Sequence, residues 1–178
     1  MPAHAEATAR VFFALVPPST LQHALGELAR DVARRVHGRP VPEENLHVTL
    51  AFIGSWPRAK LSVLSDVAAT VRSRSICITL DTLGGFRRAG VAWIAPSAPS
   101  SELQQLAQAL ARRLDDAGVT LEAREFHAHM TLARHCRGPY PKDAVGRYVW
   151  DIDAMMLMAS DTRTEGARYT VLTRWDFG

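Results

Sequence analysis

The stretch "LHVTLAFIG", residues 46–54, contains a histidine, one apolar residue, a threonine and a leucine, and the same order returns in "AHMTLAR", residues 128–134. Both stretches have the apolar character of a strand. Side chains alternate along a strand, so His47 and Thr49 share one face of the first, and His129 and Thr131 share one face of the second. Each stretch therefore predicts a strand with one polar face and one face directed into the core.

The second pattern begins 82 residues after the first, and other residues match at the same offset. Residues 17–51 align without a gap with residues 99–133 and share 12 identities over 35 positions, where chance gives about two or three. Leu/Ala/Arg-rich helices can resemble each other through composition, but composition does not explain the matches that lie beyond the helix. Those matches are Glu43/Glu125, His47/His129, Thr49/Thr131, Leu50/Leu132 and Ala51/Ala133. We therefore predict an internal duplication within a single domain that spans residues 1–178.

The two copies predict the same order of elements. The first copy has a strand over residues 10–16, a helix capped by Ser19 or Thr20 that runs to Val36, and the strand 46–54. The second has a strand over 90–96, a helix capped by Ser100 or Ser101 that runs through Leu114, and the strand 127–134. Between the copies we expect a helix over 58–73 and a strand over 76–83. After them we expect a strand pair over 150–160 and 167–177, with Glu165 and Gly166 in its connection.

This order predicts an α+β fold. We expect two similar lobes related by an approximate twofold axis, with two mainly antiparallel sheets facing a central cleft, and helices outside. The two His-x-Thr strands would then face each other across the cleft.

Composition narrows the classes of protein. A chain of 178 residues with 47% hydrophobic residues can bury a core without disulfides or metal staples. Its two cysteines, Cys77 and Cys136, are too few for a disulfide framework and favour reduced thiols in the cytosol. No apolar run is long enough for a signal-peptide core or a membrane span. The net charge of +3 suits a polyanionic ligand without identifying one.

Two imidazoles and two hydroxyls in one cleft suit in-line displacement at phosphorus. One histidine would take a proton from the attacking water or hydroxyl, and the other would give a proton to the leaving oxygen. Imidazole can play either part, because its usual pKa is about 6.5. The threonines would donate hydrogen bonds to phosphoryl oxygens. This chemistry needs no metal, cofactor or covalent intermediate.

A zinc site is the alternative to acid–base chemistry. His127 and His129 together with His47 would supply three imidazoles, which is enough for a catalytic zinc. The paired threonines have no role in such a site, and no acidic residue with ligand-like spacing lies beside the motifs. A single His-x-Thr would more often be an ordinary structural feature, and it is the repetition that favours a catalytic role.

The segments "ENLHVTLAFIG" and "FHAHMTLAR", with "RVFFALVPP" near the start, resemble the 2H phosphoesterase superfamily. More narrowly they resemble the bacterial RNA 2′,3′-cyclic phosphodiesterases, also called 2′-5′ RNA ligases. The likeness covers nearly the whole chain, including the closing "SDTRTEGARYTVLTRWDF". It implies a bilobal α/β fold, hydrolysis of an RNA 2′,3′-cyclic phosphate end to a 2′-phosphate, and weak reversible joining of RNA ends through a 2′-5′ bond.

The resemblance also implies roles for residues. His47 and His129 would be the catalytic pair, and Thr49 and Thr131 would hold the phosphate. A 2′-phosphate product requires the oxygen at 3′ to leave, so the resemblance makes His47 the proton donor and His129 the proton acceptor. Because the two motifs are nearly equivalent, the residues alone do not decide which histidine is the donor and which is the acceptor.

Other residues near the motifs have two interpretations each. Arg134 matches an arginine that the family often carries, but strict alternation puts it on the face opposite His129. A phosphate-binding role for Arg134 therefore needs a twist or bulge, and otherwise it is a solvated residue at the strand end. His127 departs from the family pattern and could alter the pKa of His129. Phe12 and Trp93 could stack on a base, although apolar strand residues more often fill the core.

The expected partner is RNA or a nucleotide with a 2′,3′-cyclic phosphate end. We expect a cytoplasmic monomer with no membrane association and no obligate protein partner. Two other functions fit the same motifs. One is a 2H phosphodiesterase for another substrate, such as an ADP-ribose cyclic phosphate or a 2′-5′ oligonucleotide, and the other is a non-catalytic RNA-binding module.

Overall fold

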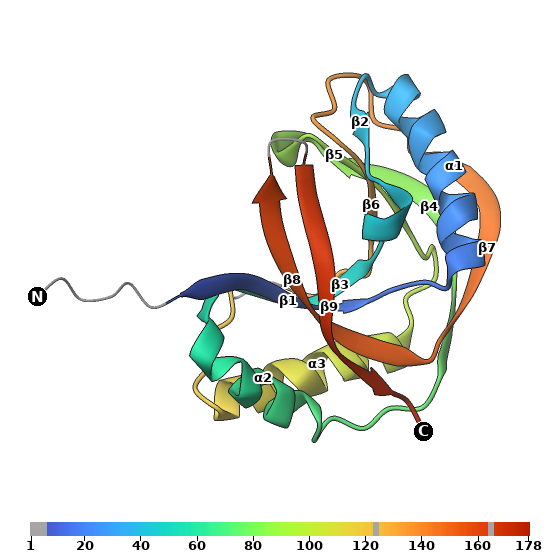
Figure 1. Cartoon of the computed structure of the whole chain (residues 1–178). Coiled ribbons are helices and arrows are strands. Elements are labelled where there is room, and N and C mark those ends of the chain that lie inside the picture. The colour runs from blue at the N-terminus through green and yellow to red at the C-terminus, as the bar shows by residue number, and fades with distance from the viewer. Residues whose placement is uncertain (1–6, 123–124, 164–165) are drawn as a thin grey trace, which may run out of the picture.

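The computed structural model describes residues 7–122, 125–163 and 166–178. Their strands form one sheet of order β7-β4-β5-β6-β3-β1-β8-β9, with β2 paired to β6, and every strand pair in it is antiparallel (Figure 1). The strands are β1 Thr8–Leu15, β2 Arg39–Pro40, β3 Val48–Pro57, β4 Ile76–Phe86, β5 Val91–Ala95, β6 Met130–Arg134, β7 Ala144–Ile152, β8 Ala154–Arg163 and β9 Gly166–Asp176. The helices are α1 Ser19–Arg35, α2 Leu61–Ala68 and α3 Ser101–Asp116.

The sheet has two halves that meet at β3 and β6. Strands β3, β1, β8 and β9 follow one another on one side of this junction, and β6, β5, β4 and β7 follow on the other. The strands of the two sequence copies, β1 and β3 against β5 and β6, thus hold equivalent places. The predicted α+β class is confirmed. The two expected sheets are, however, hydrogen-bonded halves of one sheet, because Val48 on β3 pairs directly with Met130 on β6.

The helix of each copy packs on the half of the sheet that the other copy builds. Helix α1 lies against β6 and β2, whereas α3 lies against β3 and α2 (Figure 1). We expected each lobe to carry its own helix. The exchange buries the α1 side chains of Leu25, Ala29 and Val32 beside the second copy's strands and so ties the two halves together.

The helix boundaries confirm the expectations in part. Ser100 caps α3, because its Oγ accepts a hydrogen bond from the Leu103 N–H at 3.2 Å. Helix α1 starts at Ser19, and Pro18 occupies its cap position without a side-chain hydrogen bond, so capping by Ser19 or Thr20 is wrong. The helix expected over 58–73 is shorter, because a 3₁₀ turn at Arg58–Lys60 precedes α2.

The C-terminal strands also differ in part from the prediction. Trp150 to Ile152 belong to β7, an unpredicted strand that pairs with β4, and β8 starts only at Ala154. The pairing of β8 with β9 is confirmed. Of the expected connection, Glu165 lies outside the described residues and Gly166 begins β9. In the described ranges, no helix is long and apolar enough to cross a membrane.

Trp93 on β5 packs directly over the backbone of Gly84 on β4, so substitution at Gly84 tests this contact. A Cβ added at Gly84 would lie 2.2 Å from the Trp93 ring. We expect Gly84→Ala to lower the free energy of unfolding by about 1–3 kcal/mol, as overpacked sites do. Urea unfolding of the wild type and the variant would measure this change in the free energy of unfolding. Gly146→Ala on β7 is the matched control, because its added Cβ meets nothing within 4 Å. Equal stability of the two variants would contradict the packing described.

Candidate active site

The pairing of Val48 with Met130 brings the two His-x-Thr motifs together. Both of these side chains are fully buried, so the residues on either side of them point to the opposite face of the sheet. Continuing the antiparallel register places His47 across from Thr131 and Thr49 across from His129. The two histidines are then diagonal neighbours, which in regular sheets have side chains about 7–8 Å apart. This separation allows both rings to reach one phosphate group.

Each histidine is held by the same backbone contact. His47 Nδ1 lies 2.7 Å from the Asn45 carbonyl oxygen, and His129 Nδ1 lies 2.7 Å from the His127 carbonyl oxygen. A carbonyl only accepts hydrogen bonds, so Nδ1 of both rings must carry a hydrogen. Nε2 of each neutral ring is therefore the basic nitrogen, available to take up a proton. Asn45 and His127 are equivalent positions of the two copies, and the two copies use the carbonyl of this position in the same way.

A β-bulge follows each threonine and changes which side chains face the cleft. In the pairing of β1 with β3 the register skips Leu50, and in that of β5 with β6 it skips Leu132, at the equivalent position. Both stretches share one burial pattern, in which a half-buried threonine precedes two buried residues and an exposed one. The exposed residues are Phe52 and Arg134. The bulge returns Arg134 to the cleft, as a phosphate-binding role requires.

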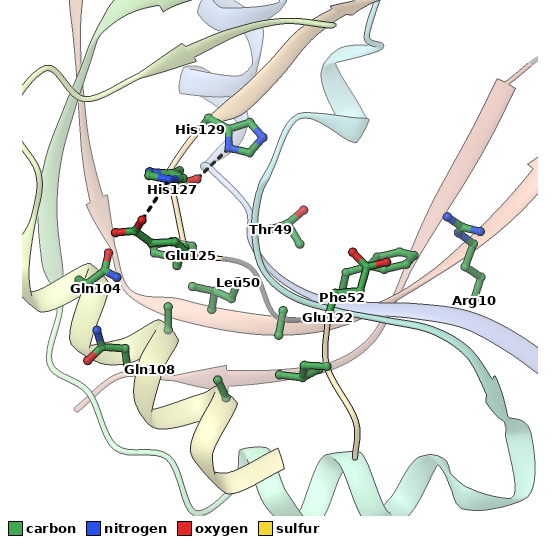
Figure 2. A pocket seen from close by; sticks show the side chains of 15 residues that line it. Arg10, Thr49, Leu50, Phe52, Gln104, Gln108, Glu122, Glu125, His127 and His129 are labelled. Carbon is green, nitrogen blue, oxygen red and sulfur yellow. Dashed lines mark hydrogen bonds and ion pairs between the residues drawn. The ribbon is translucent and has the colours of Figure 1, made fainter. Parts of the chain in front are cut away.

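Two adjoining cavities occupy the cleft and share Arg10, Thr49 and Phe52. The smaller, of about 160 Å³, contains His47 and also Phe12, Arg134, Ser160 and Tyr169. We call it the His47 cavity. The larger, of about 760 Å³, contains His129 and extends over α3 and β3 (Figure 2). We call it the His129 cavity. Thr49 thus lies between the two histidines, at the boundary of the two spaces.

Aromatic rings flank each histidine. Phe12 and Tyr169 lie 5.0 and 5.2 Å from the His47 ring, centroid to centroid. Phe86 and Trp93 lie 5.1 and 6.4 Å from the His129 ring. Phe12 belongs to a small buried cluster on the cleft face of the sheet, so it fills a core and lines the site as well. These contacts restrict rotation of the imidazoles.

Asn45 ties the loop before His47 to the C-terminal hairpin. Its side chain is buried, and its Nδ2 donates a hydrogen bond to the Ala167 carbonyl oxygen at 2.7 Å. The same residue's carbonyl accepts from His47 Nδ1. Asn45 therefore fixes β9, and with it Tyr169, against the His47 ring.

The pKa of each of the two motif histidines is lowered. Burial lowers the pKa of His47 most, the Asn45 carbonyl acts in the opposite direction, and the charges of Arg134 and His129 lower it further. Burial also lowers the pKa of His129 most, the His127 carbonyl opposes this, and the charges of His127 and Arg134 add to the lowering. Arg134 is therefore close enough to act on both rings.

The candidates divide into those at the cavities and those away from them. His47, His129, Thr49 and Arg134 line the cavities, and Thr49 Oγ1 donates to His47 Nε2 at 3.1 Å. Thr131 is half-buried, pairs with Trp93 on the neighbouring strand β5, and is absent from the described lining of both cavities.

The groups needed for a zinc site are not assembled in the described part of the chain. His127 turns its Nε2 towards Glu125 Oε2 at 3.8 Å rather than towards the other histidines (Figure 2). Among residues 7–122, 125–163 and 166–178, no group of three or more potential ligands is placed to hold a metal ion.

Among the residues at the site that the sequence reasoning did not identify are Arg10, Phe52, Phe86 and Tyr169. Phe52 could have been found, because the offset of 82 residues maps Arg134 onto it. The other three come from strands without a recognisable polar pattern.

Comparisons with known proteins agree with this geometry. The family model described as the 2′-5′ RNA ligase superfamily matches residues 17–162. The chain is similar to the RNA 2′,3′-cyclic phosphodiesterase of Escherichia coli, with 32% identity over 93% of this chain and 95% of that one. It is also similar to that of Thermus thermophilus, with 28% identity over 93% and 89% of the two chains. The crystal structure of E. coli LigT complexed with 3′-AMP superposes with a TM-score of 0.88 and 31% identity, covering 96% of this chain and 99% of that chain.

Arg134→Gln tests the electrostatic coupling in the cleft. Removing a positive charge that lowers the pKa of both histidines should raise both pKa values, and NMR titration of the imidazole C–H signals would measure them. Arg74→Gln removes the same charge from the exposed segment between α2 and β4 and should leave both values unchanged. Equal titration curves for the wild type and Arg134→Gln would contradict the placement of Arg134.

Proposed function

The chain belongs to the 2′-5′ RNA ligase superfamily, and we propose that it hydrolyses RNA 2′,3′-cyclic phosphate ends to 2′-phosphomonoesters by two-histidine acid–base catalysis. The observation that carries the proposal is the matched pair of Nδ1 contacts at 2.7 Å. They leave both Nε2 atoms for proton transfer within one cleft. In-line displacement needs such a pair, one on each side of the phosphorus.

The proposed reaction uses the histidines in turn. His129 Nε2 takes a proton from water, and the water oxygen attacks the phosphorus. The bond between phosphorus and the 3′ oxygen breaks, and protonated His47 gives a proton from Nε2 to that oxygen. The product is a 2′-phosphate with a free 3′-hydroxyl. The assignment of acid and base follows the likeness to the family.

Thr49 and Arg134 stabilise the charge that develops on the phosphoryl oxygens. The Thr49 hydroxyl, which donates to His47 Nε2 in the free protein, donates to a phosphoryl oxygen once the substrate is bound. Arg134 adds a permanent positive charge at the His47 cavity. By the likeness to the family, we assign Thr131 the equivalent part in the second motif.

The names of relatives support the substrate class. Five similar proteins, from bacteria and archaea, carry the name RNA 2′,3′-cyclic phosphodiesterase. E. coli LigT has been crystallised with 3′-AMP, ATP and phosphate, which are ligands with phosphate groups. We infer the same substrate class for this chain, whose cleft holds His47, His129 and Arg134.

The proposal extends to the state of the protein in the cell. We place it in the cytoplasm as a monomeric, single bilobal domain built from the duplicated halves 17–51 and 99–133. The free thiols of Cys77 and Cys136 suit a reducing compartment. The equivalent places of the two copies in the sheet support the duplication.

Substitution of either catalytic histidine tests the mechanism. We expect His47→Ala and His129→Ala each to lower kcat for a nucleoside 2′,3′-cyclic phosphate by about 10²–10⁴, the usual contribution of one acid or base. His23→Ala, on the exposed side of α1, is the control. EDTA should leave the rate unchanged. Wild-type turnover in either cleft variant would contradict the mechanism, and loss of activity in EDTA would favour zinc.

The pH dependence of kcat/KM follows from the lowered pKa values. The base must be neutral and the acid protonated, so the profile should be bell-shaped. Because burial lowers the pKa of both histidines in the free enzyme, both limbs should lie below about pH 6.5. The bound phosphate's negative charge favours the protonated rings, so the profile of kcat should lie at higher pH. Initial rates with adenosine 2′,3′-cyclic phosphate would measure both, and limbs of kcat/KM above neutral pH would contradict the account.

A further inference from the structure

Exposed arginines gather around the end of β6, beside the cleft. They are Arg39 on β2, Arg87 and Arg88 in the 3₁₀ turn between β4 and β5, Arg134 at the end of β6 and Arg137 shortly after it. We call these five residues the arginine patch. Figure 1 shows β2 and the start of β5 at the end of the molecule opposite α2. The patch therefore combines residues that lie far apart in the sequence.

Backbone hydrogen bonds hold the segments of the arginine patch together. Arg39 is the partner of Arg134 in the pairing of β2 with β6, and residues directly opposite each other have side chains on the same face of a sheet. The Cys136 N–H donates to the Gly90 carbonyl oxygen at 3.0 Å, which joins the segment after β6 to the turn between β4 and β5. The five arginines therefore stand on segments that are bonded to one another.

Carboxylates leave the positive charge of the arginine patch uncompensated. In the part of the chain that the structure describes, no ion pair joins a patch arginine to an aspartate or glutamate. Arg34 and Arg35, in the last turn of α1, are by contrast paired with Asp31 and Asp143. Like charges repel one another, so a cluster of unpaired guanidinium groups favours an anionic ligand. Guanidinium groups match phosphate in geometry, and a nucleic acid strand presents phosphates at regular intervals.

The arginine patch is continuous with the site of the two motif histidines. Arg134 belongs to the patch and also lines the His47 cavity. On the other side, the Phe86 ring lies edge-on to the His129 ring at 5.1 Å between centroids, and Arg87 follows Phe86 directly in the sequence. Phe86 is exposed. An exposed aromatic ring beside basic side chains is the arrangement that binds single-stranded nucleic acid.

The chemistry of the proposed substrate gives the strand one way to leave the site. A 2′,3′-cyclic phosphate is the 3′ end of an RNA, so the rest of the strand continues only from the 5′ oxygen of the terminal nucleotide. A cyclic mononucleotide has no such continuation. Contacts outside the two cavities therefore distinguish the end of an RNA strand from a mononucleotide.

We propose that the arginine patch binds phosphates of the nucleotides that precede the cyclic phosphate end, and so makes the protein prefer the end of a single RNA strand to a cyclic mononucleotide. This inference rests on the proposed function and adds a second binding surface to it. Contacts to phosphates do not read the bases, so the preference depends on the length and charge of the strand. Salt weakens such contacts, because binding releases counterions from the strand.

The experiment compares two substrates that differ only in the strand before the cyclic phosphate. They are adenosine 2′,3′-cyclic phosphate and a single-stranded RNA of about ten nucleotides that ends in the same group, a length within the usual site sizes for single strands. The wild type should have the higher kcat/KM for the RNA, and increasing salt should reduce this preference.

Arg39→Gln combined with Arg88→Gln removes two charges from the arginine patch. This variant should lower kcat/KM for the RNA by about tenfold or more, as the loss of two charge-assisted contacts implies, and leave kcat/KM for the mononucleotide unchanged. The slope of log kcat/KM for the RNA against log salt concentration should become shallower by about 1.4, because each phosphate contact to a single strand contributes about 0.7.

Lys60→Gln combined with Arg74→Gln is the matched control, because both residues are exposed, carry the same total charge and flank α2 rather than the cleft. Its kcat/KM for both substrates should equal that of the wild type. An unchanged RNA preference in the patch variant overturns the inference. An equal loss in the control also overturns it, since net charge alone would then explain the effect.

The two substrates separate this inference from the proposed function. An equal loss on both substrates in the patch variant overturns the inference, since the arginines would then serve the site or the fold rather than the strand. Hydrolysis of both substrates by the wild type without a preference for the RNA overturns this inference alone. Absence of hydrolysis by the wild type overturns the proposed function and this inference with it.

Discussion

The pairing of Val48 with Met130 is the contact on which the whole site depends. It joins the halves of the sheet at the strands that carry the two His-x-Thr motifs. Both side chains are buried, so the histidines and threonines beside them share the open face. A slip of one residue in either strand would turn the histidine and threonine of that strand into the core. The buried faces of α1 and α3, each packed across the junction, oppose such a slip.

Backbone and side-chain contacts around the two histidines suit this arrangement to acid–base chemistry. The carbonyl oxygens of Asn45 and His127 fix the hydrogen on Nδ1 of each ring, and the flanking aromatic rings hold the imidazoles in place. The bulges at Leu50 and Leu132 then turn the next exposed side chain back to the cleft. On one side that side chain is Phe52 and on the other it is Arg134, so the symmetric backbone carries different chemistry at its two ends. The two cavities likewise differ in volume and in the side chains that line them.

Much of this could be predicted from the sequence, for a physical reason. Period-two patterning and a constant offset specify which strands are equivalent and which face is polar, and these gave the α+β class and the places of His47, His129 and Thr49. The bulges at Leu50 and Leu132 were harder to predict, because the register of a strand depends on its pairing with the neighbouring strand. A clue existed in the consecutive apolar residues Leu132 and Ala133, which break the alternation.

Other features could not be predicted because they depend on tertiary contacts. Strand β7 is largely exposed on its outer face and has no clear alternation, so its role appears only from its pairing with β4. Tyr169 reaches the site because Asn45 binds the β9 backbone at Ala167, and no local pattern records such a contact. The packing of each helix across the junction likewise follows from the direct pairing of β3 with β6.

The most direct test of the central claim is a crystal structure of the protein with a nucleoside and vanadate, which mimics the five-coordinate phosphorus of the reaction. The account predicts that Nε2 of His47 and Nε2 of His129 lie within about 2.6–3.2 Å of oxygens on opposite sides of the vanadium, as acid and base must. Vanadate held by only one of the two rings, or by both rings from the same side, would contradict it.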